Sequence, residues 1–281
     1  MKTQIYDANK QILQQAADLL KRGEVVGFPT ETVYGLGANA MNADAVKKIF
    51  AAKGRPQDNP LIVHIADKQD IFRYGNEISD KAVALADRFW PGPLTLIVKS
   101  SEVIASEVTC GLDTVGIRCP ENEIARELIA LADLPIAAPS ANRSGRPSPT
   151  TAQHVLADMN GYIPMILDGG PCSVGVESTV ISMVTDTPII LRPGIISRED
   201  IEAVIGPVDL SPSIDMQLSD DSKVQSPGMK YRHYAPSCPL YIISGERDAV
   251  MSYINSHATS KTGILCFSGE ERLFSVGKVL S

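Results

Sequence analysis

The sequence lacks the features of a membrane or exported protein. No continuous apolar run reaches about 18 residues, the minimum for a membrane-spanning helix. The first residues, MKTQIYDANKQILQQ, mix charges and amides where a signal peptide would have an apolar core. The five cysteines are odd in number and form no Cys-x-x-Cys pair, and the four histidines are scattered without metal-ligand spacing. We therefore expect a cytoplasmic protein with reduced thiols and no zinc site.

An excess of positive charge is also missing. The chain has 26 Lys and Arg against 33 Asp and Glu, a net charge of −7. Proteins that coat nucleic acids non-specifically depend on neutralising phosphates, so this class is disfavoured. Hydrophobic residues make up 44% and charged residues 21%, which is typical of a globular protein and excludes global disorder. Any anion site must therefore be a local basic cluster.

The common nucleotide and hydrolase motifs are absent. The sequence contains no G-x-x-x-x-G-K-[ST], G-x-S-x-G or H-E-x-x-H. GLGANA (35–40) matches the G-x-G-x-x-A of dinucleotide sites, but the following helix is predicted to begin only at Asn42. Asp58, at about the spacing of the ribose-binding acid, falls in a polar loop. We interpret the glycines as a tight turn after a strand, with a dinucleotide site as the weaker alternative.

Hydrophobic periodicity predicts a mixed α/β domain. Helices are expected at 8–22, from Asn42, at 79–89, at 121–133 and from Ser197, and strands at 24–28, 61–65, 94–98, 114–119, 135–138, 164–168, 178–184 and 188–192. Strands and helices do not alternate strictly, so an α+β arrangement with a mixed sheet fits better than a doubly wound parallel sheet.

Composition divides the chain into three parts. We expect a catalytic domain at 1–206, a linker rich in Ser, Asp and Pro at 207–238, and a small second domain at 239–281. The second domain reads as one β-α-β unit, with strands at 239–244 and 262–267 and a helix near 246–256. One such unit cannot bury its own faces, so this domain looks truncated.

Basic residues recur beside glycines and at predicted strand ends. Lys53 and Arg55 flank Gly54, Arg118 ends one strand, and Arg192 ends another before Pro-Gly. Such positions suit a phosphate or carboxylate pocket, although each residue taken singly is equally a solvated surface residue. The small-residue loop APSANRSGRPSPTT (138–151) offers hydroxyls and backbone N–H groups that can hold phosphates. The alternative is a surface loop that caps the next helix.

Seven segments, weak singly but specific together and in order, resemble the L-threonylcarbamoyladenylate synthase family, the YrdC-type enzymes. They are FPTETVYGLG (28–37), AAKGRPQDNPLIVHI (51–65), WPGPLT (90–95), GLDTVGIRCP (111–120), PSANRSGRPSPT (139–150), GVESTV (175–180) and LRPG (191–194). SPGMKYRHYAP (226–236) resembles the interdomain linker of the long, two-domain form of this family.

The resemblance implies both an activity and a fold. The family makes threonylcarbamoyl-AMP and pyrophosphate from L-threonine, bicarbonate or CO₂, and ATP, with Mg²⁺ bound mainly through the ATP phosphates and no metal site on the protein. The product feeds the tRNA threonylcarbamoyl transferase machinery that modifies adenosine in tRNA. The implied fold is a twisted open mixed sheet around a positively lined cavity, with a small Rossmann-like C-terminal domain and no membrane association.

The resemblance also implies site residues. Lys53 and Arg55 are the expected catalytic residues. The residues expected to hold L-threonine are Thr30, His64, Arg118, Ala138 and Ser178. Those expected on the nucleotide are Lys53, Arg55, Thr114, Ser140, Asn142, Ser148, Arg192 and a linker tyrosine, Tyr231 or Tyr234, of which we favour Tyr231. Arg118 is expected to clamp the threonine carboxylate with two guanidinium nitrogens. His64 is interpreted as a positioning group, or alternatively as a histidine satisfied in the core.

A different class of function stays open from the sequence. A non-catalytic RNA-binding module could use the same basic cavity for an RNA backbone. The net charge of −7 and the absence of paired aromatic RNA-stacking motifs disfavour that reading. Direct contact of this chain with tRNA is left undecided.

Overall fold

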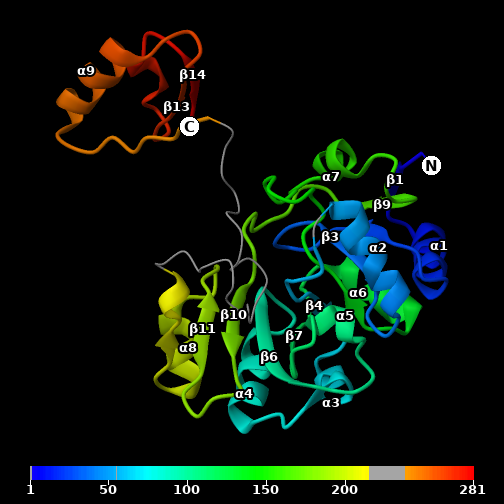
Figure 1. Cartoon of the computed structure of the whole chain (residues 1–281). Coiled ribbons are helices and arrows are strands. Elements are labelled where there is room, and N and C mark those ends of the chain that lie inside the picture. The colour runs from blue at the N-terminus through cyan, green and yellow to red at the C-terminus, as the bar shows by residue number, and fades with distance from the viewer. Residues whose placement is uncertain (1, 55, 215–237) are drawn as a thin grey trace. The chain divides into compact units, whose positions relative to one another are not determined.

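The computed structural model describes residues 2–54, 56–214 and 238–281 (Figure 1). The chain divides into two compact units, Met1–Ala235 and Pro236–Ser281, which are described separately. The elements of the first unit are β1 (Gln4–Asp7), α1 (Lys10–Lys21), β2 (Val26–Phe28), β3 (Gly35–Asn39), α2 (Ala43–Lys53), β4 (Ile62–His64), a 3₁₀ turn (Lys68–Asp70), α3 (Ile71–Tyr74), β5 (Gly75–Asn76), α4 (Asp80–Phe89), β6 (Leu94–Ser100), α5 (Ser106–Thr109), β7 (Thr114–Arg118), α6 (Glu123–Ala132), β8 (Ile136–Ala137), α7 (Ala152–Met159), β9 (Met165–Asp168), β10 (Thr179–Ser182), β11 (Ile189–Arg192), α8 (Arg198–Ile205), β12 (Asp209–Leu210) and a 3₁₀ turn (Pro212–Ile214). Those of the second unit are α9 (Arg247–His257), β13 (Gly263–Leu265), a 3₁₀ turn (Glu271–Leu273) and β14 (Lys278–Leu280).

One mixed sheet organises the first unit. Its strand order is β1-β9-β2-β3-β8-β4-β7-β6-β10-β11-β12, with β5 paired to β6. Parallel pairs such as β4–β7 and β6–β10 adjoin antiparallel pairs such as β6–β7 and β10–β11. The expectation of a mixed α/β sheet rather than a doubly wound parallel one is confirmed.

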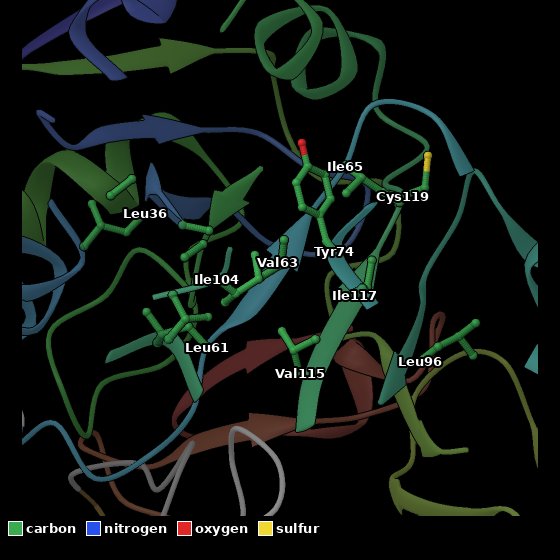
Figure 2. Packing of buried hydrophobic residues seen from close by; sticks show 14 of the residues in the cluster. Leu36, Leu61, Val63, Ile65, Tyr74, Leu96, Ile104, Val115, Ile117 and Cys119 are labelled. Carbon is green, nitrogen blue, oxygen red and sulfur yellow. The ribbon is translucent and has the colours of Figure 1, made fainter. Parts of the chain in front are cut away.

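The two faces of this sheet carry different side chains. Alternate residues of the central strands, including Val63, Ile117 and Leu96, form the larger core on one face, seen close up in Figure 2. On the opposite face α1 and α6 pack over Phe28, Ile136 and neighbours at one end of the sheet. Side chains alternate between the two faces along a strand, and Val63 and Ile117 point into the larger core. The next residues along these strands, His64 and Arg118, therefore point to the second face.

Local signals explain where the helices begin. The Asn42 side chain accepts hydrogen bonds from the backbone N–H groups of Asp44 and Ala45, at 3.0 and 3.1 Å, and α2 starts there as predicted. Ser197 and Asp200 form a reciprocal capping box at the start of α8, also as predicted. These short-range bonds are readable in sequence because both partners lie within three residues.

The turn expected at 35–40 is wrong, because Gly35–Asn39 is strand β3, antiparallel to β2. Its glycines are required by packing. A Cβ on Gly37 would lie 2.8 Å from both Ile136 Cγ2 and Phe28 Cε1, and one on Gly35 would lie 2.9 Å from the Phe28 ring. The glycines therefore make room for Phe28, and α2 opens only after a further turn, so a dinucleotide fingerprint is not supported.

The strands near the end of the first unit and in the second unit differ in part from those expected. Asp209–Leu210 pairs in parallel with β11, and Val208 is buried, so the sheet extends past the boundary expected at 206. The strand expected at 239–244 does not form, and Ile242 there is 91% exposed. The strand expected at 262–267 is present as Gly263–Leu265, which pairs in parallel with β14. The Rossmann-like character and truncation of this unit stay predictions.

Candidate active site

Strand register places a polar row across the second face of the sheet. His64 on β4 is paired with Arg118 on β7. The pairing of Leu96 with Ile117 in the antiparallel β6–β7 ladder puts Thr95 opposite Arg118. Val180 on β10 lies between Thr95 and Arg192. Neighbouring strands are about 4.8 Å apart, so the row from His64 to Arg192 spans about 19 Å.

Arg118 is held by a buried ion pair. Its Nη2 lies 2.7 Å from Glu31 Oε1, and the two side chains are only 5% and 3% exposed. The other oxygen of Glu31 accepts a hydrogen bond from the backbone N–H of Glu121 at 3.1 Å, and Arg118 Nε donates to the Gly92 carbonyl at 3.4 Å. These bonds use two of the five guanidinium N–H groups, so an end-on clamp on a carboxylate through Nη1 and the second N–H of Nη2 would leave both bonds in place.

His64 is buried next to Arg118 on the neighbouring strand. Its ring packs edge-on against Phe28 at 5.9 Å, and its Nδ1 lies 3.3 Å from the Ile62 carbonyl oxygen. Burial, reinforced by the positive charge of Arg118, lowers the pKa of His64 to about 3. The ring is therefore neutral near pH 7, so it can position a substrate group but cannot supply a positive charge.

Thr30, in the segment after β2, is bonded within its own turn. Its hydroxyl lies 2.9 Å from Thr32 Oγ1 and donates to the Val33 carbonyl at 2.6 Å. Thr30 and Glu31 line an open pocket of about 400 Å³. Pro29, next to Thr30, also lines this pocket, and the remaining lining comes from the start of α6 and the loop after β9: Glu121, Asn122, Glu123 and Gly169–Ser173.

Ser178, directly before β10, forms hydrogen bonds with a side chain of β6 and a side chain of β11. Its hydroxyl lies 2.8 Å from Thr95 Oγ1 and accepts from Arg192 Nη2 at 3.0 Å. Arg192 Nε also donates to the Ser178 carbonyl at 3.0 Å. A residue expected on threonine is thus in contact with one expected on the nucleotide.

Lys53 connects the end of α2 to the small-residue loop. Its Nζ donates to the backbone carbonyls of Ser140 and Asn142, the latter at 2.7 Å, and lies 3.4 Å from Asn142 Oδ1. The Ser140 hydroxyl donates to the same Asn142 side-chain oxygen at 2.5 Å. Three expected nucleotide residues therefore form one cluster, in which the lysine is 3% exposed.

The remaining expected residues are more dispersed. Ala138 is buried directly after β8, and its N–H bonds the Ile62 carbonyl on β4 at 2.9 Å. Ser148 donates to the Glu177 carboxylate, next to Ser178. Thr114 begins β7 and shares a face with Arg118, but it lies four residues away along the strand, about 13 Å. Arg55, Tyr231 and Tyr234 lie outside the described residues.

Three residues of this site were missed by sequence reasoning: Glu31, Thr95 and Glu177. Each lies inside a segment that carries the family resemblance, namely FPTETVYGLG, WPGPLT and GVESTV. Their partners are 87, 83 and 29 residues away in sequence. The motifs could have marked these residues as candidates, but only the fold identifies their partners.

The described part of the chain contains neither a metal-binding cluster nor a membrane-spanning helix. Among those residues no group of three or more His, Cys, Asp or Glu side chains is arranged to hold a metal ion. In the same ranges no helix is both long enough and apolar enough to cross a bilayer.

Comparison with known proteins identifies the family. The Sua5_yciO_yrdC family model, described as telomere recombination, matches residues 18–194, and the model of the threonylcarbamoyl-AMP synthase C-terminal domain matches 196–279. The threonylcarbamoyl-AMP synthase of Bacillus subtilis is 51% identical, covering 96% of this chain and 78% of the relative, and that of Pyrococcus abyssi is 54% identical, covering 84% and 68%. The crystal structure of P. abyssi Sua5 complexed with L-threonine matches with a TM-score of 0.89 and 44% identity, covering 99% of this chain and 82% of that one. This chain therefore belongs to the threonylcarbamoyl-AMP synthase family.

Proposed function

We propose that this protein is an ATP-dependent L-threonylcarbamoyladenylate synthase, a nucleotidyltransferase. It converts L-threonine, bicarbonate or CO₂, and ATP into threonylcarbamoyl-AMP and pyrophosphate. Two similarities support the proposal: the relatives at 51% and 54% identity are named for this product, and a structural relative at 44% identity was crystallised with L-threonine.

One observation of the fold carries the proposal. His64 and Arg118, which the family resemblance assigns to threonine, and Arg192, which it assigns to the nucleotide, are far apart in sequence but lie in one row across the sheet. A positively charged end at Arg192 and a second positive group at Arg118, about 14 Å apart over three strand spacings, suit one substrate with a carboxylate and another with phosphates.

The chemistry requires two anions to meet. The threonine amine adds to CO₂ with loss of a proton, or condenses with bicarbonate with loss of water, and gives a carbamate. A carbamate oxygen then attacks the α-phosphorus of ATP, and pyrophosphate leaves. We propose that Lys53, Arg55 and Arg192 reduce the charge repulsion and hold the reactants in line. Arg118 binds the threonine carboxylate through Nη1 and Nη2 while it keeps its bond to Glu31.

The remaining residues take positioning roles in this proposal. Thr30, neutral His64, Ala138 and Ser178 surround the amino acid. Ser140, Asn142, Ser148 and Thr114 line the nucleotide side, and the distance of Thr114 from Arg118 suits contact with a distal part of ATP. Tyr231 is the favoured linker contact to the nucleotide.

Magnesium fits this site as a companion of ATP. Mg²⁺ is commonly bound by one or two carboxylates together with substrate phosphates. Glu177 accepts a hydrogen bond from Ser148, an expected nucleotide residue, and its carboxylate could join such an ion. When bound, the ion would neutralise part of the triphosphate charge.

We further propose that the product passes to the tRNA threonylcarbamoyl transferase machinery in the cytoplasm. The five cysteines, all within the described residues, are free, which suits a reducing compartment.

Pyrophosphate release from ATP tests the activity. We expect release that requires both L-threonine and bicarbonate, with formation of threonylcarbamoyl-AMP. Release that needs neither would overturn the proposal. Absence of ATP turnover together with RNA binding that weakens steeply with salt would instead favour the non-catalytic RNA-binding module.

A further inference from the structure

Thr95 belongs to a network of three hydrogen-bonded residues. The other two members have expected roles in substrate binding, but Thr95 has none. The network joins Thr95 on β6, Ser178 before β10 and Arg192 at the end of β11. Thr95 is fully buried and Ser178 is 1% exposed. The two buried hydroxyls bond each other, and the Arg192 guanidinium donates to that of Ser178. This geometry is fixed because leaving any of these polar groups without a partner costs free energy.

The donors and acceptors of this network can be assigned in part. A guanidinium can only donate, so Ser178 Oγ and the Ser178 carbonyl both accept from Arg192. A hydroxyl has one hydrogen and two lone pairs, and the bond to Arg192 uses one lone pair of Ser178. The bond between Thr95 and Ser178 uses one further position, whichever hydroxyl donates. Ser178 therefore has a single position left for another partner.

Thr95 lies between the two ends of the polar row. It stands opposite Arg118 in the β6–β7 ladder, and Val180 separates it from Arg192. A Cβ on Gly116 would lie 3.2 Å from the Thr95 methyl, so the methyl already packs against the neighbouring strand. The hydroxyl is thus directed to Ser178 while the methyl is used in packing.

We propose that Thr95 is a positioning residue through which nucleotide binding strengthens L-threonine binding. The inference rests on the proposed function, in which Arg192 contacts ATP and Ser178 contacts threonine. When Arg192 Nη2 turns from Ser178 to a phosphate oxygen, Ser178 regains a lone pair that can accept from the threonine ammonium or hydroxyl. Thr95 keeps Ser178 oriented during this exchange. The coupling is reciprocal, so threonine strengthens nucleotide binding equally.

Calorimetric titration of L-threonine into the full chain tests the inference. The titration is done with and without α,β-methylene-ATP, in which the bond to be cleaved is replaced. For the wild type we expect threonine to bind at least about 5-fold more tightly with the nucleotide. In Thr95→Val, which removes the hydroxyl and keeps the shape, this ratio falls to about 1. Thr95→Ser, which retains the hydroxyl, keeps the wild-type ratio.

Thr179→Val is the matched control. Thr179 is the next residue after Ser178, is also fully buried, and donates its hydroxyl to the Ile196 carbonyl at 2.8 Å, outside the network. We expect this variant to lower the melting temperature but to keep the coupling ratio. If Thr95→Val does not fold, Thr95→Ala removes the same hydroxyl and places a smaller apolar group beside Ser178.

The outcomes separate the two proposals. A wild type without coupling, a Thr95→Val variant with the wild-type ratio, or equal losses in Thr95→Val and Thr179→Val would each overturn the role of Thr95. A wild type that binds no threonine and releases no pyrophosphate would overturn the proposed function itself.

Discussion

At the scale of single residues, the pairing of Arg118 with Glu31 decides what this arginine can do. From the sequence, an arginine at a strand end is expected to be available to bind a substrate carboxylate. In the fold its charge is already balanced by a buried carboxylate at 2.7 Å, and that carboxylate is tied to the backbone N–H of Glu121. Glu31 therefore fixes the direction of the guanidinium.

Glu31→Gln should destabilise the protein by about 3–5 kcal/mol, because it leaves the Arg118 charge buried without its counter-ion. Urea unfolding followed by the fluorescence of Trp90, the sole tryptophan and a buried one, measures this. Glu24→Gln is the control: it breaks an ion pair with Lys48 whose side chains are 40% and 46% exposed, and should cost less than about 1 kcal/mol. Equal losses in the two variants would contradict the role given to Glu31.

The titration of His64 gives a second prediction at this scale. Its folded pKa of about 3 lies below the usual 6.5, so between these values the unfolded chain binds a proton that the folded chain does not. This contribution to stability is therefore present above pH 6.5 and is lost as the pH falls toward 3.

His64→Gln should remove that contribution, which amounts to a slope of at most about 1.4 kcal/mol per pH unit. Urea unfolding at a series of pH values between 3 and 7 compares the variant with the wild type. His154→Gln, at an exposed position, is expected to keep the wild-type slope. A His64→Gln curve parallel to the wild type would show that His64 titrates normally.

At the scale of elements, β3 shows why a glycine-rich segment can be a buried strand. Gly35 and Gly37 lie on the side of β3 that faces the Phe28 ring. The residues that make the segment look like a turn are thus those that let β2, β3 and β8 approach. Their small size is a requirement of the neighbouring strands.

Gly37→Ala should destabilise the protein by about 1–3 kcal/mol, because the added Cβ would come within 2.8 Å of Phe28 and Ile136. Gly27→Ala on the adjacent strand is the graded comparison, since its Cβ would meet Ile166 at 3.2 Å, a contact that a small shift relieves. Denaturant midpoints rank the two variants. A larger loss in Gly27→Ala would show that Phe28 can move aside.

At the scale of the whole molecule, the two units differ sharply in the amount of core. The first unit has a continuous sheet with buried side chains on both faces. In the described residues 238–281, Ile264 is the one buried side chain, and β13 and β14 pair only with each other. Few buried apolar contacts mean a low free energy of local opening.

Amide hydrogen exchange should reveal this difference. Amides of α9, β13 and β14 are expected to exchange at least about 100-fold faster than those of β6 and β7, because their opening costs about 3 kcal/mol less. Mass spectrometry of peptic fragments resolves the two regions within one sample. Equal protection would show that the second unit is stabilised by contacts beyond those within it.

Much of the architecture could be predicted from the sequence because its signals are local. The side chains of Asn42 and Ser197 bond backbone N–H groups within three residues, so the starts of α2 and α8 were correct. Apolar periodicity located the central strands, and the ordered motifs indicated the family. Local signals failed where packing overrode them, at Gly35–Asn39, and where a strand needed a partner, at 239–244.

Only the tertiary structure decided how the site is assembled. Sequence nominated His64, Arg118 and Arg192 separately, but their alignment in one row depends on the register of β4, β7, β6, β10 and β11. Likewise the partners of Glu31 and Thr95 lie more than 80 residues away. Register is set by pairing and burial across the whole sheet, and a slip of one residue would turn these side chains to the other face. The chain by itself therefore determines which residues can do the chemistry, and the sheet determines which of them meet.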